Sequence, residues 1–337
     1  MINEFRAINL LDRNSFRVEQ QAARLVEFDE ADDLVALFER ERPEQWMVLS
    51  GGNNVLFTAD YEGLLITPVS QRIELLEEQG DEVVVRADAG VEWDDLVAWS
   101  VERELWGLEN LSLIPGKVGA APVQNIGAYG AEAKDTIRTI HWVDTAEGCR
   151  KVAMEAAEAR FGYRESIFKH ELKGRAIITA VDFVLPRTPA PRIGYGDVER
   201  EVMARGGISL TNIREAICAI RRSKLPDTAV LGNAGSFFKN PVVERSVAES
   251  LLAEWPDMPH YPAADADHTK LAAGWLIDRA GLKGYCSGKV GVHDRQALVL
   301  VNYGGATGGE VIELAHYVMN QVEARFGIRI EPEVNIL

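Results

Sequence analysis

The sequence predicts an α+β protein of two or three domains, and three observations support this. The chain has 337 residues, which is more than one small hydrophobic core can serve. Segments typical of short strands and of amphipathic helices follow one another without a strict strand–helix–strand rhythm. Three prolines between Pro186 and Pro191 predict a linker between domains.

The chain is strongly acidic, which limits its partners. It has 52 acidic and 36 basic side chains, a formal net charge of −16, and such a field repels polyanions. We therefore expect no nucleic acid and no membrane among its partners. The sequence has no run of about 18 apolar residues, the length that a membrane-spanning helix needs. The first residues lack the pattern that we expect of a signal peptide. We expect a cytoplasmic monomer, in which an anionic small ligand would need a local cationic pocket.

Cysteine and histidine usage gives no sign of a metal site. The three cysteines, Cys149, Cys218 and Cys286, are odd in number and far apart, so they suggest neither a disulfide framework nor a zinc site. The six histidines have no spacing typical of metal ligands. We predict a protein of a reducing compartment that binds no metal.

In the first half, hydrophobic patterns predict several strands and one helix. Runs of apolar and β-branched residues indicate the strands. The helix is predicted after Gly90, because the apolar residues that follow share one helical face. The strands are Trp46–Leu49, Val55–Phe57, Val83–Ala87, Thr139–Val143 and Ala176–Leu185, and the helical face is formed by Trp93, Leu96, Val97 and Val101.

The second half is predicted to contain two longer helices. Thr211 is the predicted N-cap of the first, which Pro226 stops. Its apolar face is formed by Ile213, Ala216, Ile217 and Ile220. The second helix has apolar residues at i, i+3 and i+4 from Val311 to Phe326, and Gly327 ends it.

Two loops have the composition of a backbone that binds phosphate or a flat ligand. The turn Ser50–Asn54 contains residues that tolerate positive φ, so its N–H groups can converge on a pyrophosphate; the alternative is an ordinary hairpin turn. The loop Pro115–Gly130 is long, small-sided and nearly uncharged, and loops of this kind are usually functional. No glycine-rich stretch has the G-x-G-x-x-G pattern, so a dinucleotide site would not be of the Rossmann type.

Six segments together resemble the UDP-N-acetylenolpyruvoylglucosamine reductase family, in the form that has a tyrosine loop. The most specific is Gly-Asn-Ala-Gly-Ser-Phe-Phe-Lys-Asn-Pro at Gly232–Pro241. The resemblance spans nearly the whole chain and keeps the family's order. The segments are Ser50–Phe57, Ile114–Glu132, Phe161–Lys169, Gly232–Pro241, Lys270–Gly281 and Glu331–Val334.

The resemblance implies an FAD-binding fold of the vanillyl-alcohol-oxidase (PCMH) type with two subdomains, followed by a C-terminal α+β substrate domain. We expect the FAD domain at residues 17–187 and the substrate domain at residues 192–337. In the family, NADPH reduces a flavin, which then reduces the enolpyruvyl ether of a UDP-sugar to give UDP-N-acetylmuramate for peptidoglycan. The turn Ser50–Asn54 has no histidine or cysteine for a covalent link, so we expect noncovalent FAD.

Three residues match the family's catalytic residues. Ser236 matches the proton donor; in isolation it would be a serine that ends a turn. Arg164 matches an arginine that could hold the substrate carboxylate; the alternative is a surface ion pair with a neighbouring glutamate. Glu333 matches a catalytic glutamate and would otherwise be one of many solvated acids. Nothing in their spacing brings the three together, so their grouping depends on the resemblance.

The remaining site residues also come from the resemblance. Tyr261, which lies between Pro259 and Pro262, is expected on a lid that closes over the substrate, unless its ring packs permanently on its own domain. Asn335 stands where the family usually has an arginine. The expected FAD contacts are Ser50, Gly51, Gly52, Asn53, Asn54, Pro115, Gly116, Gly119, Asn125, Gly127, Ala128 and Tyr129. The expected substrate contacts are Tyr195, Lys224, Asn240, Tyr261 and Gln296.

Two other functions remain open from the sequence. An oxidase on the same flavin fold would pass its electrons to oxygen. A catalytically idle protein that binds a flavin or a nucleotide sugar would need no acid, and the joint presence of Ser236, Arg164 and Glu333 argues against it.

Overall fold

The computed structural model describes residues 2–146 and 148–337, which fold into two compact units. The first unit consists of the chain up to Ile8, Ala22–Gly51 and Glu62–Ser223. The second consists of Asn9–Gln21, Gly52–Tyr61 and Lys224–Leu337. The predicted functional domains, residues 17–187 and 192–337, stay a prediction. The two units are defined by how compactly the chain folds, and the limits of a functional domain need not coincide with them.

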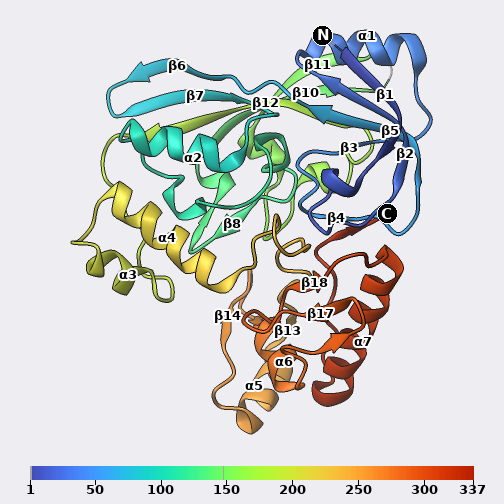
Figure 1. Ribbon diagram of the computed structural model, residues 1–337. Coiled ribbons are helices and arrows are strands. Elements are labelled where there is room, and N and C mark those ends of the chain that lie inside the picture. Colours follow the sequence, from blue (N-terminus) through green and yellow to red (C-terminus); the bar gives the residue numbers. More distant parts are fainter. Residues whose placement is uncertain (1, 147) are drawn as a thin grey trace. The chain divides into compact units, whose positions relative to one another are not determined.

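An antiparallel sheet and the helix that covers it form the main core of the first unit. The strand order is β11-β10-β12-β7-β6, and α2 lies across one face of the sheet (Figure 1). Trp93, Leu96 and Val97 of α2 pack with Val83 and Val85 of β7. The helical spacing of the first three residues and the alternate positions of the two valines predict these buried faces. The elements are β6 (Ile73–Gln79), β7 (Glu82–Asp88), β10 (Ile137–Asp144), β11 (Arg150–Glu155), β12 (Ala176–Pro186) and α2 (Trp93–Glu102).

A second sheet has the strand order β1-β2-β5-β3, in which β3 and β5 are parallel. Leu34, Leu37 and Phe38 of α1 pack against this sheet and against Val143 and Ile177 of the larger one. Burial on one face therefore anchors an otherwise polar helix. The elements are β1 (Ile2–Asn9), β2 (Gln21–Phe28), β3 (Trp46–Val48), β5 (Tyr61–Pro68) and α1 (Ala31–Glu41).

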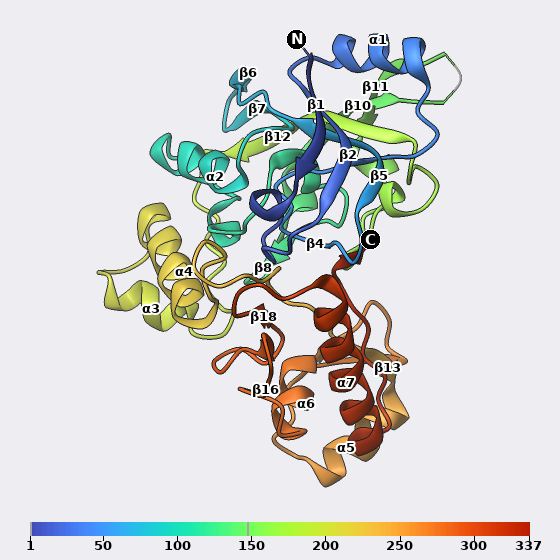
Figure 2. The same ribbon diagram turned by 45° about the vertical axis from the view of Figure 1, so that its right-hand side comes forward.

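Helices α3 (Val198–Ala204) and α4 (Leu210–Lys224) pack together through their apolar faces (Figure 2). The predicted cap of α4 is wrong by two residues. Ser209 caps the helix, since its hydroxyl accepts the N–H of Asn212 at 3.1 Å, and Thr211 lies inside the first turn. Serine and threonine cap helices by the same hydrogen bond, so the pattern alone did not separate them.

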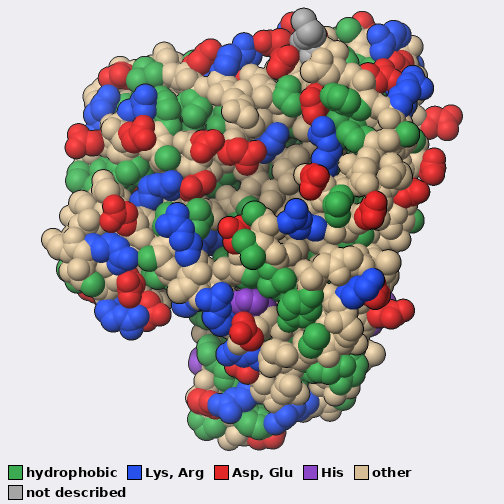
Figure 3. Space-filling model, viewed as in Figure 1, with side chains coloured by type: hydrophobic (Ala, Val, Ile, Leu, Met, Phe, Trp, Pro, Cys, Tyr) green, Lys and Arg blue, Asp and Glu red, His purple; other side chains and the backbone are tan. Residues whose placement is uncertain are grey.

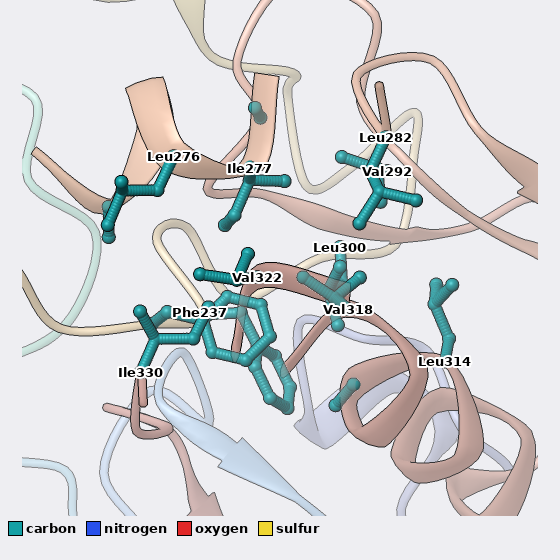
Figure 4. Packing of buried hydrophobic residues seen from close by; sticks show 14 of the residues in the cluster. Phe237, Leu276, Ile277, Leu282, Val292, Leu300, Leu314, Val318, Val322 and Ile330 are labelled. Atoms are coloured by element: carbon teal, nitrogen blue, oxygen red, sulfur yellow. The ribbon is translucent and has the colours of Figure 1, made fainter. Parts of the chain in front are cut away.

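The core of the second unit is built around α7 and a pair of phenylalanines. Phe237 and Phe238 are almost completely buried, and their ring centroids are 5.0 Å apart. Phe237 points into a cluster with Val322 and Ile330 (Figure 4). Gly327 ends α7 with φ of 67°, as the sequence predicts.

Short strands and two further helices complete the second unit. One three-stranded sheet has the order β13-β15-β14 and another the order β16-β17-β18, while β4 pairs with β19 in parallel. The elements are β4 (Val55–Leu56), β13 (Val242–Glu244), β14 (His260–Pro262), β15 (His268–Leu271), β16 (Cys286–Ser287), β17 (Val290–Val292), β18 (Leu300–Asn302), β19 (Asn335–Ile336), α5 (Arg245–Glu254), α6 (Ala273–Arg279) and α7 (Gly308–Phe326).

Acidic and basic side chains lie interspersed on the face seen in Figure 3, although the net charge is −16. Within residues 2–146 and 148–337, no helix is both long enough and apolar enough to cross a membrane.

Candidate active site

The segment Leu113–Gly130, which contains the loop Pro115–Gly130 that the sequence predicts to bind FAD, has an unusual backbone. We call this segment the left-handed loop. Leu113, Gly116, Asn125, Tyr129 and Gly130 all have left-handed φ, between 45° and 121°. Three of these residues carry side chains, for which this conformation costs about 1–3 kcal/mol each. Alternation of left- and right-handed residues turns successive N–H groups to one side, which is the geometry that binds anions. Positive φ at several residues of one loop is consistent with the backbone of an anion-binding segment.

Backbone hydrogen bonds hold the start of this loop against the end of β7 and the start of α2. The N–H of Trp93 donates to Gly116 O at 2.8 Å, and the N–H of Gly119 donates to Ala89 O at 3.1 Å. A Cβ on Gly119 would lie 2.6 Å from the Cβ of Ala89, so no larger residue fits at this position. The pairing of Gly119 with Ala89 thus fixes how closely the loop approaches the sheet.

The other predicted FAD segment, Ser50–Asn54, is not a hairpin turn. Its flanking strands pair elsewhere: β3 with β5, and β4 with β19. Gly52 has φ of 64°, and a Cβ there would lie 2.1 Å from Arg13 O. The Ser50 hydroxyl is buried without a hydrogen-bond partner within the described residues, and such a group normally has one. An orphaned hydroxyl beside two glycines fits the approach of a phosphate or a ribose.

These two segments fit an FAD molecule by their chemistry. The left-handed loop supplies backbone with positive φ at five residues, and Ser50 supplies an unsatisfied hydroxyl. Of the predicted contacts, Ser50 and Gly51 belong to the first unit, together with Pro115–Tyr129, whereas Gly52–Asn54 belong to the second.

Arg164 lies against the predicted FAD loop. It has φ of 55° in a tight turn that Gly162 and Glu165 close by mutual hydrogen bonds. Its Nη2 donates to Gly127 O at 2.7 Å, and a Cβ on Gly127 would lie 3.2 Å from its Nη1. The structure thus brings a predicted catalytic residue and a predicted cofactor residue together, and glycine at position 127 leaves room for the guanidinium.

Tyr195, a predicted substrate contact, packs on Tyr129 of the same loop. The ring centroids are 6.0 Å apart and the rings are nearly perpendicular. Tyr195 is 47% exposed, while burial raises the pKa of the Tyr129 phenol. Arg164, Gly127, Tyr129 and Tyr195 form the part of the candidate site that lies in the first unit.

In the second unit, Ser236 and Glu333 lie on neighbouring segments. The N–H of Glu333 donates to Phe237 O at 2.7 Å, and the N–H of Phe237 donates to Leu298 O at 2.7 Å. The segment with Ser236 therefore lies between the segment of Glu333 and the chain that follows Gln296. Asn54 joins the group, since its side-chain amide donates to Glu333 O at 3.3 Å.

The other predicted substrate contacts of the second unit have local structural partners. Gln296 Oε1 accepts the N–H of Leu298 at 3.4 Å. Asn240 Oδ1 accepts the N–H of Ala273, the first residue of α6, at 3.0 Å. Tyr261 lies in the edge strand β14, opposite Lys270 of β15. Lys224 is exposed and is the last residue of α4.

Two charged residues that the sequence analysis did not single out, Asp94 and Arg221, contact the loop, and a third, Arg214, holds Asp94. Asp94 of α2 accepts two hydrogen bonds from Arg214 of α4, at 2.6 and 2.9 Å, and one from the Leu113 N–H at 2.5 Å. Arg221 Nε donates to Leu113 O at 3.2 Å. Arg214 and Arg221 are two helical turns apart on α4, and this spacing is the signal that could have identified them.

A separate cavity of about 480 Å³ lies in the first unit, and no predicted site residue lines it. Its two arginines are paired with carboxylates. Arg72 binds Asp88 at 2.8 Å and Arg86 binds Asp182 at 2.6 Å. This balance of charge gives no preference for a ligand of either sign.

Comparison with protein families matches two parts of the chain. Residues 22–151 match the FAD binding domain. Residues 226–337 match the C-terminal domain of UDP-N-acetylenolpyruvoylglucosamine reductase. The left-handed segment from Leu113 to Gly130 falls in the first match, and the segment with Ser236 and Glu333 falls in the second.

Full-length relatives carry the same name. The chain is 49% identical to UDP-N-acetylenolpyruvoylglucosamine reductase of Chromobacterium violaceum over the whole of both proteins. It is 48% identical to that of Pseudomonas aeruginosa over 96% of each.

A solved structure supports the fold. The crystal structure of the reductase from Thermus caldophilus, 22% identical, superimposes with a TM-score of 0.69 and covers 100% of this chain and 98% of that one. Together with the FAD binding domain match, this confirms the predicted fold class, an α+β FAD-binding fold of the PCMH type with a C-terminal α+β domain.

Proposed function

The chain belongs to the UDP-N-acetylenolpyruvoylglucosamine reductase family, and from this membership we propose its reaction. The protein reduces UDP-N-acetylglucosamine enolpyruvate to UDP-N-acetylmuramate, a step of peptidoglycan precursor synthesis in the cytoplasm. NADPH is the hydride donor, and the region that matches the FAD binding domain, residues 22–151, holds a noncovalent FAD.

The observation that carries the proposal is the pairing around Phe237. Its O accepts the N–H of Glu333, and its N–H donates to Leu298 O. Ser236, immediately before it, therefore occupies a segment fixed on both sides by backbone hydrogen bonds. A general acid must be held in place to transfer a proton efficiently, and this segment has that rigidity.

Reduction of the enolpyruvyl double bond requires a hydride at one carbon and a proton at the other. When bound, FAD supplies the hydride. Ser236 donates the proton to the other carbon. A serine hydroxyl is a very weak acid, so the step depends on a strongly basic carbanion and a fixed geometry. Burial of Phe237 and Phe238 in the core fixes that geometry.

Arg164 and Glu333 act on the charge that develops in the substrate. The guanidinium of Arg164 is held by Gly127 O at 2.7 Å, and in the proposed reaction it binds the substrate carboxylate. As the carbanion forms, its charge spreads onto this carboxylate, and a fixed cation stabilises it. Glu333 orients the intermediate. Because its N–H is bonded to Phe237 O, it keeps its register with Ser236.

The remaining site residues bind the two large ligands. Backbone N–H groups of the left-handed loop and the Ser50 hydroxyl hold the FAD, for which we propose contacts from Ser50, Gly51, Gly52, Asn53, Asn54, Pro115, Gly116, Gly119, Asn125, Gly127, Ala128 and Tyr129. Lys224 provides positive charge for the UDP diphosphate of the substrate. The further substrate contacts that we propose are Tyr195, Asn240, Tyr261 and Gln296.

An anaerobic two-step experiment tests the function. The yellow protein is mixed with NADPH, and loss of the flavin absorbance reports reduction. The enolpyruvyl substrate is then added without oxygen, and return of the absorbance reports transfer to the substrate. Reoxidation by oxygen alone, with no response to the enolpyruvyl substrate, would instead identify an oxidase.

The state of the flavin is tested separately. Acid precipitation should release all of the yellow colour into the supernatant, as expected for noncovalent FAD. Flavin retained in the pellet would contradict this part of the proposal.

A further inference from the structure

The left-handed loop needs external support, because its conformation is unfavourable for the residues that it contains. Leu113 at one end has φ of 60°, and Tyr129 at the other has φ of 48°. Neither is glycine, and each is disfavoured by about 1–3 kcal/mol in this conformation. Such residues persist only where the surrounding contacts over-determine them.

Arg221 interacts with both ends of the loop. Its Nε donates to Leu113 O at 3.2 Å, and its positive charge offsets part of the rise that burial causes in the pKa of the Tyr129 phenol. The planar guanidinium has donors that point in different directions, so one side chain can act on two neighbouring groups. One group on α4 therefore acts on both ends of the segment, in addition to the backbone hydrogen bonds that hold its start.

Asp94 and Arg214 complete the support on the other side of Leu113. Asp94 accepts the Leu113 N–H, so both backbone polar groups of Leu113 are bonded to charged side chains. Asp94 is in turn fixed by two hydrogen bonds from Arg214. Burial alone would raise the pKa of Asp94, but the hydrogen bonds from Arg214 and the Leu113 N–H hold it below its usual value.

The charge of Arg221 is not matched by a carboxylate of its own. Asp94 is hydrogen-bonded to Arg214, and no ion pair involves Arg221 within residues 2–146 and 148–337. Burial lowers the pKa of the Arg221 guanidinium. A charged group is costly to remove from water without a strong partner, so retaining arginine here requires a role that a neutral residue cannot fill.

We propose that Arg221 is a positioning residue for FAD: it acts on both Leu113 and Tyr129 and so holds the loop in its phosphate-binding conformation. The inference rests on the proposed function, since it takes the loop to be the FAD site. Arg221 acts through the backbone of the loop. Asp94, which Arg214 holds in place, supports the same part of the loop by accepting the Leu113 N–H.

Titration of FAD into the apoprotein, followed by quenching of flavin fluorescence, tests the proposal. Arg221→Gln should raise the FAD Kd roughly 10- to 100-fold, the loss expected for charge-assisted hydrogen bonds. Arg222→Gln is the matched control, because Arg222 is the next residue of α4 and is exposed; its Kd should equal that of the wild type. Arg221→Lys keeps the positive charge but lacks the planar guanidinium with its several donors, and should bind FAD nearly as weakly as Arg221→Gln.

A rescue experiment separates positioning from other roles. Glycine adopts left-handed φ without strain, so Leu113→Gly in the Arg221→Gln background should recover at least severalfold of the lost FAD affinity, relative to Leu113→Gly alone. If Arg221→Gln cannot be purified in a folded form, the Arg221→Lys background carries the same comparison.

The possible outcomes are distinct. Unchanged FAD affinity in Arg221→Gln, wild-type affinity in Arg221→Lys, or no rescue by Leu113→Gly would each overturn the inference while the proposed function stands. A wild-type apoprotein that takes up no FAD would overturn both.

Discussion

The loop from Leu113 to Gly130 and the segment from Gly232 to Pro241 both carry candidate site residues, but they are stabilised in different ways. The loop has a left-handed backbone and is supported by charged side chains of α2 and α4. The segment with Ser236 is hydrogen-bonded to neighbours on two sides and anchored by two buried phenylalanines.

This difference separates ligand binding from folding. The charged contacts to the loop lie outside the apolar core, so their loss should change the loop more than the fold. Phe237 belongs to the core of its unit (Figure 4), so its loss should change the fold first. A substitution in each region should therefore leave a different signature, and the following predictions are ordered by the size of the expected effect.

The largest effect is expected for Ser236→Ala. Loss of a general acid typically lowers a rate by about 10²–10⁴-fold, so flavin reoxidation by the enolpyruvyl substrate should fall by that factor. Flavin reduction by NADPH should stay nearly intact, because it needs no proton from Ser236. Stopped-flow absorbance measures the two half-reactions. Ser250→Ala on α5, where the hydroxyl bonds Ser246 O, is the control, and equal losses in both half-reactions would show that Ser236 is not the acid.

Truncation of the neighbouring side chain should act on stability instead. Phe237 is completely buried, and Phe→Ala in a core typically costs about 3–5 kcal/mol. We expect urea denaturation of Phe237→Ala to give a free energy of unfolding lower by this amount. Val230→Ala, at a side chain that is 82% exposed, should change it little. A stable Phe237→Ala protein with lost activity would mean that the phenylalanine serves the site rather than the core.

The sequence predicts the local features of both regions better than their long-range partners. Apolar periodicity located the strand at Val83–Ala87 and the helices that begin near Trp93 and end at Phe326, because each pattern reflects one buried face. The turn at Ser50–Asn54 could not be resolved in this way. Its flanking strands pair with β5 and β19, and such pairing depends on residues far away in the chain.

The candidate site shows the same limit. Family motifs pointed to Ser236, Arg164 and Glu333. The structure adds local contacts for Arg164, for Glu333 and for Phe237, the neighbour of Ser236. Arg221 was missed because a charged residue on a helix is usually a solvated one. Its bond to Leu113 O depends on a loop folded back from another part of the chain, which no local pattern contains.

A smaller effect on stability is expected from Asp94→Asn, and it should depend on pH. The pKa of Asp94 is depressed in the folded protein, so its contribution is present above the unfolded value of about 3.9 and is lost as the pH falls through the lower folded value. At neutral pH the variant should be less stable by about 1–3 kcal/mol. The difference from the wild type should shrink below about pH 4, as measured by urea denaturation at several pH values.

The control for this prediction is an exposed ion pair of the same unit. Asp32 binds Lys151 at 2.7 Å, but its side chain is 77% exposed, and exposed pairs contribute about 0–1 kcal/mol. Asp32→Asn should therefore change stability little. A difference between Asp94→Asn and the wild type that stays constant down to pH 2 would show that the carboxylate charge is not what supports Leu113.

Lys224→Ala should affect substrate binding without loosening FAD. Lys224 ends the same helix that carries Arg214 and Arg221, so this variant tests whether α4 serves the two ligands through different residues. We expect the KM for the UDP-sugar to rise roughly tenfold, the loss of one charge-assisted contact. The rise should be smaller at high salt, because salt screens charge attraction. An equal rise in KM for Arg222→Ala, at the exposed neighbouring arginine, would indicate a general electrostatic attraction by this end of α4 and not a direct contact by Lys224.

The smallest effect is expected for Tyr261→Ala, because Tyr261 is held in yet another way. It lies in the edge strand β14, opposite Lys270, whose Nζ is 5.9 Å from the centre of its ring. If the strand acts as the predicted lid, it moves together with β15 or its pairing to β15 opens. Loss of the ring should then raise the KM for the sugar nucleotide about threefold, since a partly exposed contact typically contributes below about 1 kcal/mol.

The melting temperature should barely change, and proteolysis near Tyr261 should slow when the substrate is bound, because closure protects the strand. Tyr317→Ala, at an exposed ring of α7, is the matched control for loss of a tyrosine. A melting temperature lower by several degrees with an unchanged KM would mean that Tyr261 packs permanently on its own unit. The edge strand would then be held like the segment of Ser236, by packing, and the lid hypothesis would be wrong.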